Sequence, residues 1–404
     1  MERRALMKNY NSKLNAGVIG LGNRGTGNLM MLCKMDDLNI TALCDVYDDR
    51  IEKNAAYVKE KRGAAPFTST DYTEIITRGD VDIVFVFSAW EPHIDMAVAC
   101  MKAGKAVAVE VGGANSVNEC WKLVNTYEET KTPCMLLENC CYDRNELMLM
   151  NMIKQDVFGE IVHCQGGYRH DIRDEIAFGK ENRHYRLRNY LHRSADNYPT
   201  HDLGPIAQML SINRGNRMVS LVSVASKARG LREYIKKVKG PDYYLSDVNF
   251  NQADIVSTII KCANGETILL TLDTTLPRAY TRALQVQGTK GMYMEENQSI
   301  FLDDAHEKFH FDWRGHWNNI EEYRSEYEHP LWRGYTPDKD DGHGGMDYLV
   351  FRAFVDSVKN GEQTPIDVYD MAAWMSVTAL SEESIVTGNA VPIPDFTNGK
   401  WMLR

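Results

Sequence analysis

The chain has 404 residues, of which 44% are hydrophobic and 25% are charged, and its formal net charge is -10 at pH 7. This length is sufficient for two domains with substantial cores, and the composition is ordinary for a globular enzyme. Because there is no basic surplus to neutralise phosphates, a general nucleic-acid-binding function is disfavoured.

The nine cysteines include no Cys-x-x-Cys pair. Their odd number and spacing indicate free thiols in a reducing compartment rather than a disulfide scaffold or a zinc site. The first ten residues are too polar for a secretory signal, and no apolar run approaches the roughly 18 residues of a membrane span. The chain as given is therefore expected to be cytoplasmic, with no membrane partner, although an exported protein whose leader had been removed would look the same.

The first predicted strand, 16–19, runs directly into a glycine-rich turn formed by Gly20, Gly22 and Gly25. In the Gly-x-Gly-x-x-Gly pattern the first glycine permits the tight turn and the second lets the backbone approach a pyrophosphate. The third lets the following helix pack close to the strand. The start of that helix offers unpaired N–H groups and partial positive charge to phosphates. The turn therefore predicts a dinucleotide site.

Asp45 follows Gly25 by about 20 residues and ends a second apolar run, 40–44. A carboxylate at this position is expected to hold a ribose 2′-hydroxyl and to repel a 2′-phosphate. The combination of strand, glycines and acid predicts NAD as the cofactor, in preference to NADP.

Apolar runs at 81–87, 106–111 and 134–139 alternate with helical segments. Continuous apolar runs of this length are typical of parallel strands that are covered on both faces. The alternation predicts an α/β fold, with a doubly wound Rossmann sheet over residues 14–142.

Several polar and aromatic groups come at the ends of these strands, where ligands of parallel sheets bind. They are the segment from Trp90 to His93, together with Glu110 and Asn139. Each taken alone is equally consistent with a turn or cap residue, but three groups at one sheet edge favour a site.

The pattern changes after residue 160. Predicted strands at 161–168, 218–225, 254–262, 267–273 and 283–287 follow one another with few helices between them. Asn264-Gly265 is a typical hairpin turn. Residues 143–404 are therefore expected to form an α+β domain with a mostly antiparallel open sheet, which binds substrate and supports oligomerisation.

Two further segments complete the chain. Residues 303–345 are predicted to be an irregular loop or lid, and 347–358 and 368–387 have helical periodicity. The C-terminal helices are free in principle to pack back on the first domain.

The second domain holds the side chains best suited to proton transfer. Tyr168 and His170 follow a strand, Arg186 lies in a basic run, and His201 comes just before an apolar helical run. A histidine exchanges protons near neutral pH. His201 alone is also consistent with a helix cap or a core histidine. A metal site from His170, Asp171 and His201 lacks a typical ligand spacing, so no metal is expected.

The chain resembles the superfamily of glucose–fructose oxidoreductase and inositol dehydrogenase over residues 14 to about 390. Within it, the sequence is most similar to glycoside hydrolase family 109, the NAD-dependent α-N-acetylgalactosaminidases. The narrower resemblance rests on Gly-Gly-Tyr168-Arg-His170-Asp171, on Tyr185-Arg186-Leu187 with Arg193, and on Tyr198-Pro199-Thr200-His201 with Leu203-Gly204-Pro205.

The resemblance implies roles for individual residues. In addition to the glycines, it implies that NAD contacts Asn23, Arg24, Asp45, Trp90 to His93, Glu110, Val111, Asn139 and Tyr198. It implies that sugar contacts Tyr168, Arg186, Tyr198, Pro199, Thr200, His201 and Tyr280. We expect His201 to accept the O3 proton, and Tyr168 and His170 to be candidates for the C2 proton.

Two departures bear on this assignment. Most dehydrogenases of the superfamily carry Glu-Lys-Pro where this chain has Glu110-Val111-Gly112, so their active-site lysine is absent. Valine suits the glycosidase branch. The proline of that branch is also missing, and Tyr185 and Ala195 replace a more usual Trp and Gly. These changes affect the identity of the sugar more than the chemistry.

The predicted activity is hydrolysis of terminal N-acetylgalactosamine-type glycosides by an NAD-dependent cycle of oxidation, elimination, addition and reduction. Ordinary glycosidases need a pair of carboxylates, and no such pair is evident among the 56 acidic residues. The alternatives are an NAD-dependent sugar or polyol dehydrogenase, and a non-catalytic NAD-binding sensor. The predicted partners are a glycan or small-molecule substrate and, by analogy with the superfamily, further copies of the chain in a homodimer or homotetramer.

Overall fold

The computed structural model describes residues 13–306 and 313–404, which form two compact units. Unit 1 contains the chain up to residue 111, together with 118–142 and 336–372. Unit 2 contains 112–117, 143–335 and 373–404. Neither unit is continuous in sequence, because residues 112–117 belong to unit 2 and residues 336–372 belong to unit 1.

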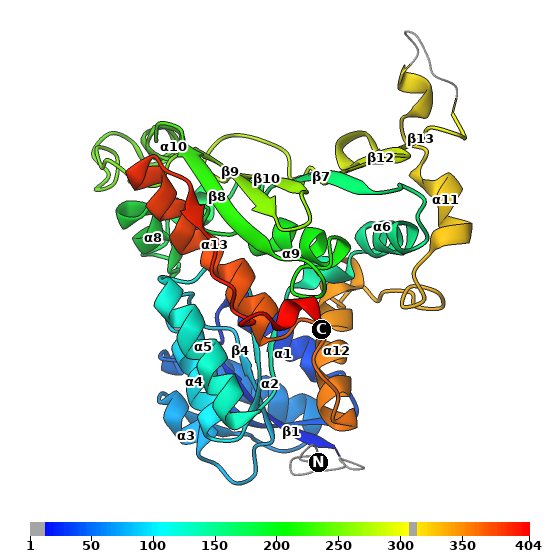
Figure 1. Cartoon of the computed structure of the whole chain (residues 1–404). Helices are drawn as coiled ribbons and strands as arrows, with labels where there is room; N and C mark the ends of the chain where they lie inside the picture. Colours follow the sequence, from blue (N-terminus) through cyan, green and yellow to red (C-terminus); the bar gives the residue numbers. More distant parts are fainter. Residues whose placement is uncertain (1–12, 307–312) are drawn as a thin grey trace. The chain divides into compact units, whose positions relative to one another are not determined.

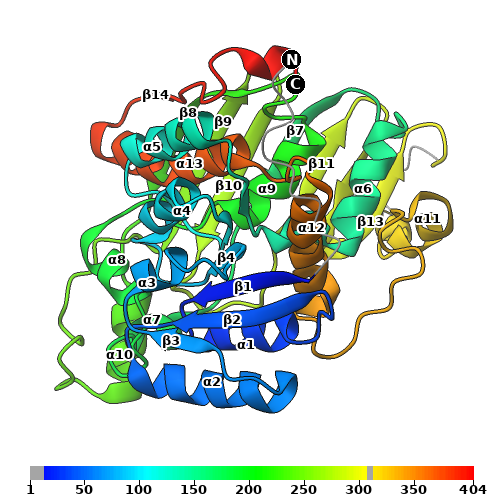
Figure 2. The same cartoon turned by 90° about the horizontal axis from the view of Figure 1, so that it is seen from below.

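Unit 1 is built on a six-stranded sheet with the order β3-β2-β1-β4-β5-β6. Every neighbouring pair is parallel, which confirms the predicted doubly wound sheet. Figure 2 shows β1, β2 and β3 side by side, with α2 along them. The strands are β1 (Leu14–Ile19), β2 (Leu38–Cys44), β3 (Phe67–Ser69), β4 (Ile83–Val86), β5 (Ala106–Val109) and β6 (Cys134–Leu136).

The helices of unit 1 connect and cover these strands. They are α1 (Asn23–Leu32), α2 (Asp48–Arg62), α3 (Tyr72–Ile76), α4 (His93–Lys102), α5 (Val117–Thr130), η1 (Asn139–Tyr142) and α12 (Met346–Asn360). Strand β4 is wholly buried, as its apolar run predicts. The Phe85 ring meets those of Phe351 and Phe354 at centroid distances of 5.8 and 5.4 Å, so α12 completes the core of this unit.

Unit 2 is built on an eight-stranded sheet with the order β13-β12-β11-β7-β10-β9-β8-β14. The pair β7 and β10 is parallel and the other pairs are antiparallel, which confirms the predicted α+β class. In Figure 1, β8, β9 and β10 lie side by side. The strands are β7 (Ile161–Gly166), β8 (Met218–Ala225), β9 (Ile255–Cys262), β10 (Thr267–Asp273), β11 (Gln285–Gly288), β12 (Gly291–Met294), β13 (Ser299–Leu302) and β14 (Val391–Pro392).

Unit 2 has more helix than the sequence indicated. Helix α9 lies on β7 and β10. The helices are α6 (Arg144–Lys154), α7 (Arg173–Ala177), α8 (Arg186–His192), α9 (Thr200–Met209), α10 (Gly230–Lys239) and α11 (Ile320–Tyr327), with α13 (Val368–Thr387) running from the last part of unit 1 into unit 2.

The prediction that 303–345 is irregular was wrong in part. Residues Ile320–Tyr327 form α11, and Trp313–His316 and His343–Gly345 form single 3-10 turns, while 307–312 lie outside the described residues. Helix α11 buries only Ile320. The helix is short and its surface mostly polar, so hydrophobic periodicity gave little signal.

All nine cysteines lie in the described part of the chain, and each is free and buried. Burial raises the pKa of the Cys44 thiol to about 12, which disfavours the reactive thiolate. Among the described helices, none combines the length and the hydropathy needed to cross a bilayer.

Candidate active site

The glycine-rich turn of unit 1 has the close packing that its sequence predicts. Gly20 has φ +94°, and a Cβ there would lie 2.5 Å from the Phe87 carbonyl carbon. A Cβ on Gly25 would lie 2.0 Å from the Gly20 carbonyl oxygen. A Cβ on Gly22 would meet nothing closer than Arg50 Nη1 at 3.5 Å. The turn is therefore closed on its inner side and open at the start of α1, where a pyrophosphate binds in this motif.

Asp45, at the end of β2, is buried and lies beside this turn. Its Oδ2 accepts the Leu21 N–H at 2.6 Å and its Oδ1 accepts the Tyr47 N–H at 3.1 Å. Each oxygen keeps a further lone pair for a ribose hydroxyl. Arg50 Nη1 lies 3.7 Å from Oδ2 and stacks on the Tyr47 ring, so the charge of Asp45 is partly compensated.

The loop after β4 holds Trp90 and His93, and both side chains are buried. Nε2 of His93 lies 2.9 Å from the Ser88 carbonyl oxygen. Nδ1 is buried without a hydrogen-bond partner among the described residues, and burial lowers the pKa of this histidine. The His93 ring is therefore neutral and shapes the loop, so the loop backbone rather than the ring is available to a dinucleotide.

Two predicted cofactor residues, Arg24 and Asn139, meet at one carboxylate that the sequence did not indicate, Asp347 in the first turn of α12. Arg24 donates from Nη1 and Nη2 to its two oxygens at 2.5 and 3.0 Å. Asn139 donates to Oδ1 at 2.7 Å, and Arg24 Nε also donates to Glu110 Oε2 at 2.9 Å. Although burial opposes ionisation, hydrogen bonds from His343 and Arg24 hold the pKa of Asp347 well below its usual range.

His343 is the second residue of this network that lies far along the chain. Its Nδ1 is 2.8 Å from Asp347 Oδ2, and its side chain is 56% exposed. Gly342, His343, Gly344 and Gly345 all have positive φ, which is unusual for a non-glycine residue and is found at functional loops. Glu110 also accepts the Val111 N–H at 3.0 Å, so the strand-end residues are held together as one hydrogen-bonded group.

Taken together, these residues of unit 1 fit a nicotinamide dinucleotide. The start of α1 has no side-chain cap, and Gly22 leaves space for a phosphate. Asp45 retains acceptor capacity for a ribose. The residues predicted for this cofactor at Arg24, Glu110 and Asn139 lie in one network, and Asn23 opens α1 beside them.

In unit 2, the predicted catalytic residues form a compact cluster of rings. The Tyr168 ring lies 4.4 Å from Tyr198 and 5.5 Å from His201, measured between centroids. The Tyr198 ring lies 4.8 Å from His201, and the His170 ring lies 5.0 Å from Tyr280. Residues from β7, α9 and the β10–β11 connection therefore converge, although they are distant in sequence.

The Tyr168 hydroxyl lies 2.9 Å from His170 Nδ1. Burial and the nearby Arg186 guanidinium lower the pKa of His170, so the ring is neutral at pH 7 and one nitrogen can accept a proton. A phenol hydrogen-bonded to a neutral imidazole is a suitable pair for proton transfer. Asp171, next in sequence, is instead held by Arg173, whose Nε and Nη2 donate to its carboxylate at 2.8 and 2.7 Å.

Arg186 is buried at the start of α8, with its guanidinium 4.9 Å from the centre of the Tyr198 ring. Glu175, which the sequence did not single out, lies with Oε1 2.8 Å from Arg186 Nε and 2.9 Å from His184 Nε2. Burial raises the pKa of Glu175, but His184 and Arg186 outweigh it and bring the value to about 2. Arg186 is thus fixed by an ionised carboxylate.

The remaining predicted sugar residues differ in access. Tyr280 is 48% exposed, whereas Thr200 is completely buried at the start of α9. Thr200 Oγ1 has no hydrogen-bond partner among the described residues. Pro199 occupies the N-cap position of α9, and His201 lies in the first turn of that helix rather than before it.

Comparisons with known proteins identify the family of this chain. The family "Glycosyl hydrolase 109, C-terminal domain" matches residues 142–403, and "Oxidoreductase family, NAD-binding Rossmann fold" matches residues 14–137. An alpha-N-acetylgalactosaminidase from Tannerella forsythia is 36% identical over 97% of this chain and 88% of its own length. A glycosyl hydrolase family 109 protein from Solibacter usitatus is 38% identical over 98% and 90%.

Solved structures share the fold at low sequence identity. Levoglucosan dehydrogenase in complex with NADH and levoglucosan has a TM-score of 0.71 and 17% identity, covering 95% of this chain and 100% of that one. Myo-inositol 2-dehydrogenase from Lactobacillus plantarum has a TM-score of 0.66 and 16% identity over 95% and 100%. These values show a common architecture. The matches over both units establish that the chain is an enzyme of glycosyl hydrolase family 109, with an NAD-binding Rossmann domain.

Proposed function

We propose that this enzyme hydrolyses terminal N-acetylgalactosamine-type glycosides with NAD as a cofactor that is regenerated in each turnover. The observation that carries the proposal is the ring cluster of Tyr168, His170, Tyr198 and His201 beside a buried Arg186. It offers proton-transfer groups, among them the neutral His170, and a fixed cation. When bound, NAD would supply reversible hydride transfer with C3 of the sugar, which would allow elimination across C1 and C2 before water adds.

The residues of the cluster divide the proton transfers between them. His201 accepts the proton of the O3 hydroxyl and returns it at the end of the cycle. Tyr168, hydrogen-bonded to neutral His170, removes the proton from C2. Arg186, Tyr198 and Tyr280 orient the sugar.

The local carboxylate is poorly suited to ordinary glycosidase chemistry. A general acid must be protonated near pH 7, whereas Glu175 is ionised and paired with Arg186 and His184. Its charge serves to hold Arg186. This supports a route in which the cofactor, rather than a carboxylate pair, makes the glycosidic bond labile.

Hydrolysis in heavy water tests the proposed route. We expect deuterium at C2 of the released sugar and no net change in NADH absorbance. A panel of nitrophenyl N-acetylgalactosaminides and their gluco epimers, each as both anomers, identifies the sugar and the anomer that the enzyme accepts. An enzyme stripped of NAD is expected to lose the activity. Stoichiometric NADH formation would instead favour a sugar or polyol dehydrogenase, and NAD binding without turnover would favour a sensor.

The preference for NAD over NADP rests on Asp45, whose carboxylate disfavours a 2′-phosphate. Arg50 reduces that effect, because its Nη1 is 3.7 Å from Asp45 Oδ2. Measured dissociation constants for the two dinucleotides test the point. We expect tighter binding of NAD, and a smaller difference in D45N than in the parent enzyme.

We also propose that the enzyme forms a homodimer or homotetramer through the outer face of the unit 2 sheet. Val222, Val224 and Ile259 are 40%, 67% and 55% exposed on this face. Val222 pairs with Ile259, which pairs with Leu269, so the apolar side chains form a row across three strands. Light scattering on the parent and on V224K tests this, because a lysine in the interface shifts the assembly toward monomer.

The free cysteines also bear on the cellular compartment of the protein. Nine free, buried cysteines suit a reducing environment, so we propose a cytoplasmic location for the chain as given. Fractionation of cells that express the native gene tests it.

A further inference from the structure

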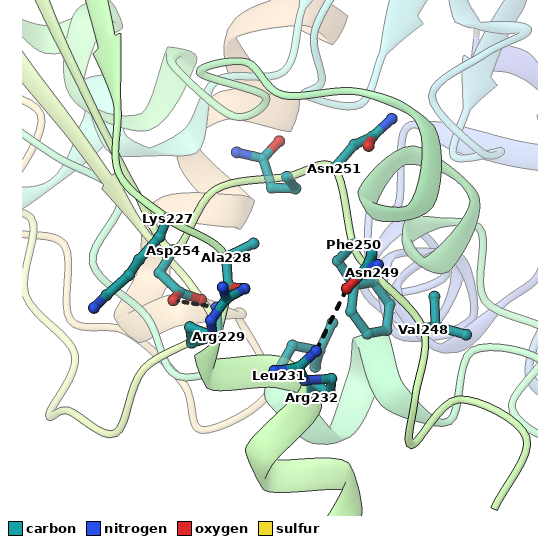
Figure 3. A pocket seen from close by; sticks show the side chains of 11 residues that line it. Lys227, Ala228, Arg229, Leu231, Arg232, Val248, Asn249, Phe250, Asn251 and Asp254 are labelled. Atoms are coloured by element: carbon teal, nitrogen blue, oxygen red, sulfur yellow. Dashed lines mark hydrogen bonds between the residues drawn. The ribbon is translucent and has the colours of Figure 1, made fainter.

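Unit 2 contains a cavity that none of the predicted sugar or cofactor residues lines. It has a volume of about 310 Å³ and lies between the start of α10 and the loop that precedes β9. Figure 3 shows the two sides of this cavity, with Arg229 and Leu231 on one and Asn249, Phe250 and Asn251 on the other. A cavity of this size is at the small end of ligand sites and accommodates one sugar ring.

The cavity is cationic. Lys227, Arg229 and Arg232 line it, and the Lys227 ammonium group extends outward at the rim in Figure 3. Asp254 is the carboxylate among its lining residues, and both of its oxygens already accept hydrogen bonds from the protein. The Asp254 oxygens accept the Arg229 N–H at 2.7 Å and the Gly230 N–H at 3.0 Å, at the start of α10, and also the Thr275 hydroxyl at 2.7 Å.

The guanidinium groups retain donors. Arg232 Nε is buried and has no hydrogen-bond partner among the described residues. Its ion pair with the exposed Glu233 is long, at 3.8 Å. Arg232 Nη1 makes a long 3.4 Å contact with Asn249 Oδ1. Arg229 Nη1 donates a hydrogen bond to the Ala228 carbonyl oxygen at 2.8 Å. Two planar cations with spare N–H groups match a carboxylate or a sulfate.

The opposite wall adds groups that suit a sugar rather than a bare ion. Asn249 presents an exposed side-chain amide, whereas the Asn251 amide nitrogen donates to the His192 carbonyl oxygen at 3.1 Å, and Leu231 and Phe250 provide buried apolar surface. Amides hydrogen-bond to hydroxyl groups, and apolar surface accommodates the C–H face of a ring. A site for a simple anion would need only the cations.

The cavity is also linked to the segment that holds the predicted sugar residues. The backbone N–H groups of Asn251 and Gln252 both donate to the Tyr190 carbonyl oxygen of α8, at 3.1 Å. The Gln252 side chain accepts from the Ala195 N–H at 3.2 Å and from Asn197 Nδ2 at 3.0 Å. The loop that lines the cavity therefore supports the segment of chain that connects Arg186 to Tyr198.

We propose that this cavity is an accessory subsite for an acidic saccharide unit, one bearing a carboxylate or a sulfate. The guanidinium groups of Arg229 and Arg232 bind the anionic group, and the Asn249 amide binds a ring hydroxyl. That the unit belongs to the glycan substrate rests on the proposed function, whereas acidic-sugar binding itself does not. The subsite thus selects acidic over neutral glycans.

Binding of matched sugars to the NAD-loaded enzyme tests the proposal. The probes are glucuronic acid against glucose, galactose 6-sulfate against galactose, and inorganic sulfate, measured by ligand-observed NMR titration. We expect each acidic sugar to bind about tenfold more tightly than its neutral partner. R229Q and R232Q are each expected to remove most of that difference. K237Q, which removes an exposed charge from the same helix outside the cavity, is expected to leave it unchanged.

Hydrolysis of a small neutral nitrophenyl glycoside is the parallel readout, and we expect it to stay within about twofold of the parent in all three variants. Equal affinity for acidic and neutral sugars, or an equal loss in K237Q, overturns the subsite. Inorganic sulfate binding as tightly as galactose 6-sulfate reduces it to an ion site and overturns the saccharide assignment. If the parent fails to hydrolyse the glycoside while Arg229-dependent binding persists, the proposed function fails and the subsite stands.

Discussion

Arg24 and Asp347 are joined by two hydrogen bonds, of 2.5 and 3.0 Å, although 323 positions separate them in the chain. The Asp347 side chain is 1% exposed, and that of Arg24 is 35% exposed. A buried carboxylate is tolerated only when it is paired and hydrogen-bonded. Asp347 meets both conditions within unit 1, where it anchors Arg24, the second residue of α1, to the start of α12.

The substitution D347N is expected to weaken NAD retention by at least about tenfold and to lower the melting temperature, because it removes one of the two buried carboxylates that Arg24 contacts and leaves only Glu110. The measurements are the amount of NAD that co-purifies and a calorimetric melt. D340N, which alters an exposed carboxylate in the same unit, is the control. Full NAD retention by D347N would show that the ion pair is dispensable for the site.

Gly25 and Gly27 provide a matched comparison within α1. A Cβ at position 25 would lie 2.0 Å from the Gly20 carbonyl oxygen, whereas a Cβ at position 27 would meet nothing within 4 Å. G25A is expected to lose NAD binding and several kcal/mol of stability, while G27A gains roughly 0.5–1 kcal/mol from higher helix propensity. Chemical denaturation and NAD titration distinguish the two. Similar behaviour of both variants would contradict the close-packing role of Gly25.

The Tyr168–His170 contact predicts a defined pH dependence. Burial and Arg186 lower the pKa of His170, so its ring becomes charged, and unable to accept a proton, only as pH falls below its usual value near 6.5. Activity is expected to decline on that acidic side. Y168F should reduce kcat by about 10²–10⁴-fold, the range typical of a lost acid–base group.

The pH profiles of kcat/KM for the parent, Y168F and H170Q test this relationship. The acidic decline is expected to weaken in H170Q. Tyr244 is half exposed, and Y244F serves as the control for loss of a phenolic hydroxyl. Activity of Y168F within twofold of the parent would sink the assigned role.

Asp196, two residues before Tyr198, is expected to make stability depend on pH. It is 2% exposed, and burial raises its pKa from 3.8 to about 7, despite hydrogen bonds from Tyr198 and Thr258 that oppose the rise. Since the folded pKa exceeds the unfolded one, the stabilisation is complete below pH 3.8 and is lost as pH rises to about 7.

D196N cannot titrate, so its stability relative to the parent is expected to increase between pH 4 and pH 7, by on the order of 3 kcal/mol. Denaturant melts at several pH values within this window measure the difference. D36N, at a fully exposed carboxylate, should parallel the parent. Parallel curves for D196N and the parent would exclude Asp196 as the titrating group.

Much of the fold was predictable because it depends on neighbouring residues. The continuous apolar run of β4 predicted a strand covered on both faces, and Asn264-Gly265 predicted the turn between β9 and β10. Helix α13 begins and ends at the predicted residues, 368 and 387. Strands β12 and β13 were missed because they are four residues long and offer too few alternations to register as a pattern.

The predicted site residues were found by motif, and the residues that hold them were not. Glu175 and Asp347 lie in segments with no motif, yet they fix Arg186 and Arg24. Carboxylates are common on surfaces, so a single Asp or Glu in the sequence does not indicate which cation it will pair with.

The sequence of neighbouring residues determines the glycine turn, the two sheet classes and the aromatic and imidazole groups of unit 2. This is because the local backbone conformation and the pattern of burial follow from adjacent residues. Which carboxylate reaches Arg24, and that His170 sits neutral against Tyr168, follows from folding instead. Charge pairing and desolvation depend on distances across space. For Arg24 and Asp347 those distances arise only when segments 323 residues apart pack together, and for His170 they depend on its burial and on the approach of Arg186.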